Sequence, residues 1–202
     1  MSTPRLARDN PFAMHHLERI PFKFETGVWS LHLQRLGQMN YCGAVVGPQG
    51  SGKTTLLLEL HEILKQEFLT SREIQFVLID EDSKNRKAQI QTLKEGASQK
   101  PILLVDGIER AGWLQRKQLF RLTRNGTGLI AAVHQRCQIP TWINCETDPQ
   151  LLQYTLEQLV GNVSHHLSER AVLRFKQRDG NIRLALRDLY DDWSEKLLPL
   201  GE

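Results

Sequence analysis

The sequence predicts an α/β fold in which a mainly parallel sheet is covered by helices on both faces. Two observations support this class: near-continuous apolar runs alternate with helix-forming stretches, and a glycine-rich turn follows the first run directly. With 202 residues, of which 40% are hydrophobic and 24% charged, the chain suits one α/β domain with a small appendage.

Five apolar runs are expected to be the strands of this sheet, at residues 42–46, 74–79, 102–105, 129–133 and 141–144. Helix-forming stretches separate most of them, at residues 54–69, 83–93 and 112–123. Strands that follow one another through helices run parallel, and strand twist makes their crossovers right-handed. The middle of the chain is therefore expected to form a parallel sheet with a helix after most strands.

The segments on either side of this core are expected to differ from it. Residues 20–25 alternate apolar and polar side chains, which predicts a short strand, and 28–36 have helical spacing before Gly37. Three helices are expected after the sheet, starting at Asp148-Pro149, after Ser168 and near Asn181. The last of them carries an apolar stripe, namely Ile182, Leu186, Leu189, Tyr190, Trp193 and Leu197. We therefore expect an N-terminal segment (1–38), a core (39–148) and a C-terminal helical extension (149–202).

The glycine-rich turn completes the phosphate-binding pattern G-x-x-x-x-G-K-[ST]. Its residues are Gly47, Pro48, Gln49, Gly50, Ser51, Gly52, Lys53 and Thr54, and Thr55 follows them in the predicted site. The glycines let the backbone wrap an anion at a helix N-terminus, with N–H groups pointing inward. Lys53 is expected to reach the β- and γ-phosphates, and the Thr54 hydroxyl to hold Mg²⁺. The turn therefore predicts a nucleoside-triphosphate site.

Polar residues at the ends of other strands extend this site. Asp106 follows the run 102–105 directly, so it is expected to hold Mg²⁺ at the carboxyl edge of the sheet. Hydrolysis also needs a group that orients or deprotonates water. Glu109 and Glu81 are the two candidates for this base. His134, at the tip of the run 129–133, is expected to contact the γ-phosphate or the water.

Two groups of basic residues each leave more than one interpretation open. Arg183 opens the last helix and shares a face with Arg187, so it either reaches the γ-phosphate or lies on a solvated face. Lys117, Arg121 and Arg124 share one helix face, which contacts DNA, contacts a neighbouring subunit's nucleotide, or is solvated. The tryptophans are expected to pack in the core or between subdomains; they are Trp29, Trp113, Trp142 and Trp193.

The composition argues against several other classes of protein, namely zinc-binding, disulfide-bonded, membrane and secreted proteins. A net charge of +3 permits an anionic partner without demanding nucleic acid. Cys42, Cys137 and Cys145 are odd in number and form no C-x-x-C pair, so neither disulfides nor zinc are expected. No apolar stretch approaches a membrane span, and the N-terminus lacks the apolar run of a signal peptide. We therefore expect a cytoplasmic protein without membrane insertion.

Taken together, these motifs resemble the additional-strand P-loop ATPases near the AAA+ and STAND-like branch. The resemblance rests on the glycine-rich loop, the strand ending in Asp106, His134, and Gly180-Asn181-Ile182-Arg183. It implies a three-layer P-loop fold with strand order 5-1-4-3-2, ATP with Mg²⁺, and a sensor role for His134. It also implies that Arg183 is a second sensor that contacts the γ-phosphate. The leading segment 10–12 is similar to one that lines the adenine pocket in some bacterial members.

The chain departs from the family pattern in three respects, one of which is a C-terminal helical tail shorter than a full AAA+ lid. Gly107 stands where many of these ATPases have the catalytic Glu directly after the metal-binding Asp. No arginine finger can be assigned among Arg110, Arg124 and Arg136. There is also no L-S-G-G-Q segment and no N-K-x-D motif, which disfavours a transporter ATPase and GTP respectively.

Three functions are compatible with these motifs. The first is an ATPase or ATP-driven switch that acts on a protein or nucleic-acid partner, with a homo-oligomer as one form. The second is a small-molecule or nucleoside kinase whose base is Asp80, Glu81 or Asp82, with residues 83–100 as a substrate lid. The third is a nucleotide-binding module without turnover. Release of phosphate to water, rather than its transfer to an acceptor, distinguishes the first from the second.

Overall fold

The computed structural model describes residues 9–24, 26–68, 72–195 and 197. Its internal contacts divide the chain into two compact units. A core unit holds residues 24–47 and 52–145, and a helical unit holds residues up to 23, residues 48–51 and those from 146 onward.

In the described part of the core unit, five parallel strands form one sheet in the order β2-β3-β4-β1-β5. Their bounds are β1 (Cys42–Val46), β2 (Ile74–Leu78), β3 (Ile102–Asp106), β4 (Gly128–Val133) and β5 (Thr141–Asn144). This is the predicted order 5-1-4-3-2 read from the other edge. The predicted fold class, a three-layer P-loop α/β fold, is confirmed.

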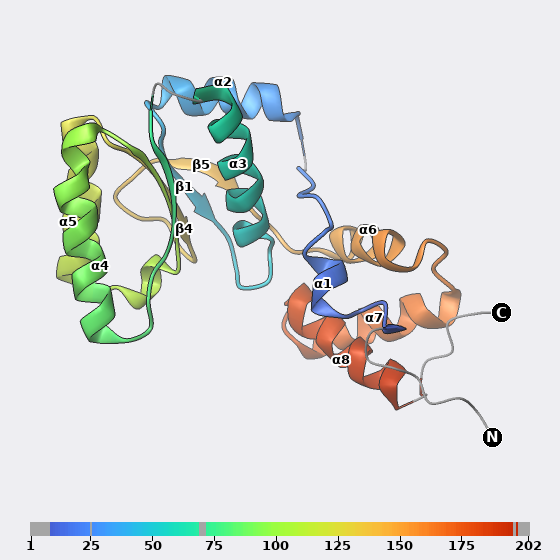
Figure 1. Cartoon of the computed structure of the whole chain (residues 1–202). Coiled ribbons are helices and arrows are strands. Elements are labelled where there is room, and N and C mark those ends of the chain that lie inside the picture. The colour runs from blue at the N-terminus through green and yellow to red at the C-terminus, as the bar shows by residue number, and fades with distance from the viewer. Residues whose placement is uncertain (1–8, 25, 69–71, 196, 198–202) are drawn as a thin grey trace. The chain divides into compact units, whose positions relative to one another are not determined.

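Helices cover both faces of this sheet (Figure 1). α3 (Lys53–Phe68) joins β1 to β2, α4 (Ser83–Gly96) joins β2 to β3, and α5 (Trp113–Leu122) joins β3 to β4. The chain moves across the sheet in one direction through α3 and in the opposite direction through α4 and α5. Since crossovers between parallel strands are right-handed, α3 is expected on one face and α4 and α5 on the other, as Figure 1 shows.

Both faces of the sheet bury aliphatic side chains. Leu103, Leu104 and Val105 of β3 are fully buried, as expected for a central strand that is covered on each side. On one face, α3 contributes four leucines with no exposed surface, which are Leu56, Leu57, Leu60 and Leu64. On the other face, Ile90 of α4 and Leu119 of α5 belong to one apolar cluster with the strands.

A helix before the sheet, α2 (Trp29–Gln38), also belongs to the core unit. The indole N–H of Trp142 donates to the carbonyl of His32 (3.0 Å), which ties α2 to β5. The strand predicted at 20–25 is wrong for its described residues, which are irregular. Pro21 has no N–H to donate to a neighbouring strand, and the Phe24 ring stacks on His32, with ring centroids 4.2 Å apart.

The helical unit consists of four helices in its described part. These are α1 (Met14–Leu17), α6 (Pro149–Val160), α7 (His165–Gln177) and α8 (Ile182–Ser194). The predicted start of the second C-terminal helix after Ser168 is wrong, because α7 begins four residues after Gly161. The Ser164 hydroxyl caps it by accepting from the backbone N–H of Leu167 (3.3 Å).

The helices of this unit pack around one apolar cluster. Its buried members are Phe12, Leu152, Leu156, Leu167, Ala171, Phe175, Ile182, Ala185, Leu186, Leu189 and Trp193. Leu197, the last residue of the predicted stripe, is 53% exposed because α8 ends at Ser194. The stripe is therefore one residue shorter than predicted.

The N-terminal segment predicted at 1–38 is not one piece. Asn10 is fully buried in the helical unit, where its side-chain amide donates to the carbonyl of Tyr190 (3.0 Å) and to the hydroxyl of Ser194 (3.2 Å). Residues up to Lys23 therefore belong to the helical unit, and those from Phe24 belong to the core. The two hydrogen bonds of Asn10 attach this part of the chain to α8.

The tryptophans do not share one environment. Trp142 and Trp193 are buried, as predicted. Trp113 is 62% exposed, so the expectation that it packs in the core or between subdomains is wrong. It is the first residue of α5, whose buried face is formed further along the helix by Leu119 and Leu122.

Candidate functional site

The glycine-rich loop adopts a turn that only glycine makes at low cost. Gly50 and Gly52 have φ angles of 83° and 82°, in the left-handed region. The Ser51 hydroxyl closes the turn by donating to the carbonyl of Pro48 (2.9 Å). α3 begins at Lys53, so the first N–H groups of the helix lack partners within it and are available to an anion.

Lys53 is held over the start of this loop. Its ammonium donates to the carbonyl of Gly47 (2.8 Å), and the side chain is nearly buried. Burial lowers the pKa of Lys53, while the neighbouring Cys145, Glu109 and Asp106 oppose this shift. The ammonium therefore lies among groups at the carboxyl ends of β3 and β5, where a phosphate can replace the carbonyl as its acceptor.

Thr54 and Asp106 lie in direct contact. The Thr54 hydroxyl donates to Oδ2 of Asp106 (2.7 Å), and Oδ1 of the same carboxylate accepts from the backbone N–H of Gly107 (2.9 Å). Mg²⁺ in nucleotide sites prefers oxygen ligands and takes only one or two from the protein. A hydroxyl and a carboxylate side by side at the end of β3 therefore fit this ion.

Gly107 explains how Glu109 returns to the same edge. The backbone of Gly107 is left-handed, with φ at 73°, and it starts the short 3-10 helix η3 (Ile108–Arg110). Oε1 of Glu109 lies 3.4 Å from Nε2 of His134 at the end of β4, and both side chains are half-exposed. A residue with a Cβ is strained at this φ, so the turn favours glycine at position 107. The structure thus brings together two predicted residues, Glu109 and His134.

Glu81, the rival base, is engaged elsewhere. Its carboxylate pairs with the guanidinium of Arg110 (3.1 Å), which also donates to the carbonyl of Ile79 (3.1 Å). The neighbouring acids have local partners as well: Asp80 accepts from the backbone N–H of Asp82, and Asp82 caps α4. Arg110, one of the candidate fingers, therefore stabilises the end of β2.

The tip of the glycine-rich loop, residues 48–51, belongs to the helical unit. Within that unit, Arg183 lies beside this tip. A Cβ on Gly50 would contact the side-chain oxygen of Asn181 and would lie 3.3 Å from the backbone nitrogen of Arg183. Asn181 also caps α8 by accepting from the backbone N–H of Leu184 (3.1 Å). Within this unit, the first turn of α8 therefore packs against the loop, and the Arg183 side chain is exposed.

Two further residues lie in this neighbourhood. Cys145 is buried just after β5, and its backbone N–H donates to the carbonyl of Val46 (2.7 Å). No pattern in the sequence marks it as a neighbour of Lys53. Asn181 lies where the sequence predicts the start of the last helix, and a small polar residue directly before a helix is the signal of an N-cap.

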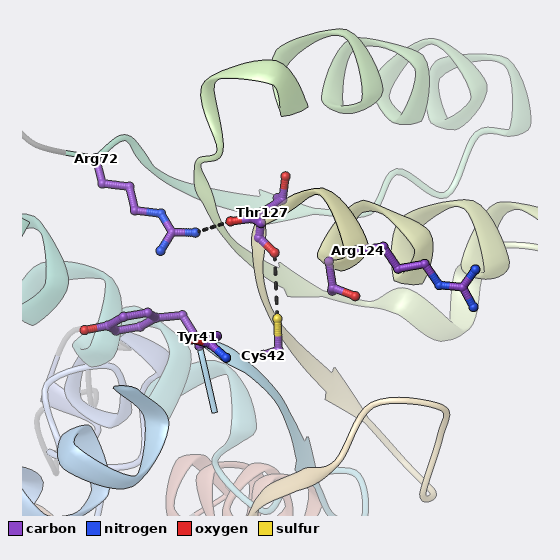
Figure 2. Close-up of a pocket in the computed structure, with 8 residues that line it drawn as sticks. Tyr41, Cys42, Arg72, Arg124 and Thr127 are labelled. Carbon is purple, nitrogen blue, oxygen red and sulfur yellow. Dashed lines mark hydrogen bonds between the residues drawn. The ribbon is translucent and has the colours of Figure 1, made fainter. Parts of the chain in front are cut away.

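A separate cavity of about 350 Å³ lies at the amino ends of the strands (Figure 2). Arg72 borders it and donates to the carbonyls of Lys100 (2.7 Å) and Gly126 (2.8 Å). Its guanidinium also lies 5.7 Å from the centroid of the Tyr41 ring. Since the predicted phosphate and metal residues are at the carboxyl ends, this cavity is not the nucleotide site.

Comparison with known families decides the class of the core. Residues 44–125 match the model of the family described as "ATPase family associated with various cellular activities (AAA)". The match lies within the core unit and includes the strands β2 and β3 and most of β1. The predicted AAA+ P-loop resemblance is confirmed, and with it an ATPase-type nucleotide-binding protein. The match includes Lys53, Asp106 and Glu109, and it ends before His134 and Arg183.

Other comparisons add little to this AAA-type core. Among solved structures, the chain is similar to one titled "Structure of C. elegans PCH-2", at 13% identity and a TM-score of 0.44. That similarity covers 84% of this chain and 67% of the other, and it carries no argument about function. No curated protein matches the chain. None of the described helices combines the length and apolar character that a membrane span needs.

Proposed function

We propose that this chain binds ATP with Mg²⁺, hydrolyses it, and works as an ATP-driven switch on a partner. The observation that carries the proposal is the hydrogen bond between Thr54 and Asp106, with Lys53 nearby. A cation and two oxygen ligands at the end of a phosphate-binding loop are the parts that a Mg²⁺–ATP complex requires.

Each residue has a distinct role in this proposal. Loop amides and Lys53 bind the β- and γ-phosphates, and Thr54 and Asp106 hold Mg²⁺, which neutralises charge on the phosphate oxygens. Glu109 accepts a proton from the attacking water as the bond between the γ-phosphorus and the ADP oxygen breaks. His134, 3.4 Å from Glu109, orients that carboxylate and senses the γ-phosphate.

The switch part of the proposal depends on α8. Its first turn packs against Gly50, and Arg183 begins that turn. A phosphate held by the loop would attract the exposed guanidinium of Arg183, because a planar guanidinium pairs well with phosphate oxygens. We propose that nucleotide occupancy thereby changes the position of α8, and that a partner reads this change.

The two competing functions have less support. A kinase would need a free acid near its acceptor, but Asp80 and Asp82 accept backbone hydrogen bonds and Glu81 pairs with Arg110. A module without turnover would lack a base, whereas Glu109 lies at the carboxyl edge beside His134. Hydrolysis therefore fits the geometry better than either alternative.

Product analysis with γ-labelled ATP and Mg²⁺ tests this function. We expect labelled inorganic phosphate from the unmodified protein and none from Lys53→Ala. Lys65→Ala is the matched control, because this exposed lysine lies on the same helix. Label on any acceptor other than water would favour the kinase. Tight ATP binding without phosphate release would favour the module without turnover.

Assembly is tested in the same assay. Proteins with AAA-type domains often complete the site with a neighbouring copy, so we propose a homo-oligomer. Of the three candidate fingers, Arg110 pairs with Glu81, whereas Arg124 and Arg136 are exposed and are in none of the described ion pairs. We propose Arg136, in the loop after β4, as the finger. Turnover per chain should rise with protein concentration; a constant value would contradict an oligomeric site.

A further inference from the structure

We propose that the outer surface of α5, extended by α4, binds single-stranded nucleic acid. This basic face of α5 is defined by Trp113, Arg116, Lys117, Arg121 and Arg124, the last of which lies in the 3-10 helix η4 (Thr123–Asn125) that follows α5. The proposal goes beyond nucleotide hydrolysis, because this surface contains none of the residues proposed to bind ATP.

The first observation is a segregation of charge along the chain. The whole chain carries 26 lysines and arginines against 23 acids, and is nearly balanced. Residues 110–145 contain no acid at all, and their basic residues are Arg110, Arg116, Lys117, Arg121, Arg124 and Arg136. Such a segment creates a local positive field that attracts a polyanion.

The second observation is that the basic residues of the α5 face are in none of the described ion pairs, although Arg110 of the same segment pairs with Glu81. Other arginines are paired: Arg170 and Arg174 bind Asp192, and Arg178 binds Asp188. None of the ion pairs among the described residues involves a basic residue of the α5 face. In Figure 2 the Arg124 side chain extends away from the cavity that its backbone borders.

The third observation is an aromatic ring within this basic face. Trp113 is 62% exposed, and the ammonium of Lys117 lies 4.9 Å from the centre of its ring. Leu114 beside it is 65% exposed. Proteins that bind single strands combine cations for the backbone with exposed aromatic rings on which unpaired bases stack. Bases in a duplex are already stacked, so the exposed indole favours a single strand.

The fourth observation is that α4 continues the same charge. α4 lies beside α5 on this face of the sheet (Figure 1). Lys84, Lys87 and Lys94 of α4 are exposed, and Glu95 is the one acid within its bounds. A single-stranded nucleic acid that binds across α5 can therefore also contact the lysines of α4.

Fluorescence anisotropy tests the proposal with labelled 20-nucleotide probes of dT and rU, a 20-bp duplex, and labelled poly-glutamate. The protein variants are Lys117→Glu/Arg121→Glu, Trp113→Ala and Trp113→Phe. Lys65→Glu/Lys176→Glu changes the net charge equally at exposed lysines of α3 and α7, and serves as the control. Circular dichroism confirms that each variant is folded.

We expect the single strands to bind. For each contacted phosphate, the logarithm of the association constant should fall by about 0.7 for each tenfold rise in salt concentration. The α5 double reversal should weaken binding at least about tenfold at low salt, and the control should weaken it much less. Trp113→Ala should cost about fivefold or more, and Trp113→Phe should restore most of the loss.

Three results would overturn the proposal. One is no binding of either single strand, and another is equal binding by the α5 double reversal and the control. The third is tighter binding of poly-glutamate with the same dependence on variants, which would assign the face to an acidic protein. The titration is repeated with Lys53→Ala, where strand binding should persist. A failure of ATP turnover is thereby distinguished from a failure of this surface.

Discussion

The hydroxyl of Thr54 donates a 2.7 Å hydrogen bond to Oδ2 of Asp106, which is 52 residues further along the chain. The two residues meet because β1 and β3 run parallel in one sheet, so that the loop after β1 and the end of β3 share an edge. This contact links the phosphate-binding loop to the strand that supplies the second oxygen ligand.

The Thr54 hydroxyl should matter as an oxygen ligand rather than as a side chain of a given size. Thr54→Ala should raise the Mg²⁺ concentration needed for half-maximal ATP turnover by about tenfold or more, because one oxygen ligand is lost. Thr54→Ser keeps the hydroxyl and should stay near the unmodified protein. A Mg²⁺ titration of turnover measures this. The same Mg²⁺ dependence in all three proteins would contradict the metal role of Thr54.

Substitution of Glu109 and of Glu81 should have different effects on turnover, because only one of them is the catalytic base. Glu109→Gln keeps the shape of the side chain but cannot accept a proton, so turnover should fall by about 10²-fold or more while ATP affinity is retained. Glu81→Gln should change turnover little, because its carboxylate pairs with Arg110. Single-turnover hydrolysis and ATP binding measure the two quantities. The reverse ranking would make Glu81 the base.

The sequence predicted much of the fold, because its signals are local. Apolar runs mark the buried strands, and the glycine pattern marks the loop whose φ angles require glycine. The order of the strands came from the family resemblance and not from the runs themselves. The predicted strand at 20–25 failed because Pro21 and the packing of Phe24 outweigh a pattern of alternation.

The parts of the site that the sequence could not supply are contacts between distant residues. Spacing suggested that Glu109 could turn back, but it did not indicate that His134 would be its neighbour. Nothing in the sequence places Cys145 near Lys53, or indicates that Arg110 engages Glu81. Such pairs depend on the order of the strands and on the conformation of the turn after Asp106. Neither of these can be derived from local sequence patterns.

Arg183 should distinguish ATP from ADP if α8 reads the γ-phosphate. Arg183→Ala should weaken ATP binding more than ADP binding, by roughly fivefold to tenfold, because a charge-assisted hydrogen bond to the γ-phosphate is lost. Arg187→Ala, one turn further along the same helix, is the matched control. Calorimetric titration with both nucleotides measures the effect. Equal losses for ATP and ADP, or none, would remove Arg183 from the switch.

Asp192 should stabilise the helical unit in a pH-dependent way. Burial alone would raise the pKa of Asp192, but hydrogen bonds and charge from Arg170 and Arg174 hold that pKa at about 2. Because the folded pKa lies below the unfolded value, the contribution, about 2 kcal/mol, is present above about pH 4. It is lost as pH falls toward 2. Thermal unfolding between pH 2 and pH 7 measures this loss.

A substitution gives the matching test of the same carboxylate. Asp192→Asn should lower the unfolding free energy by about 2 kcal/mol at pH 7, since two arginines lose their partner. Asp188→Asn is the control, because Asp188 pairs with the more exposed Arg178 and should cost less than about 1 kcal/mol. Equal effects of the two substitutions would show that Asp192 has no special role.

The most direct test of the central claim is Mg²⁺-dependent ATP turnover by the purified protein beside Lys53→Ala and Asp106→Asn. We expect turnover in the unmodified protein, its loss on removal of Mg²⁺, and a fall of about 10²-fold or more in both variants. Circular dichroism should find all three proteins folded. Turnover that persists in both variants, or ATP that fails to bind the unmodified protein, would contradict the claim that this edge of the sheet is an ATPase site.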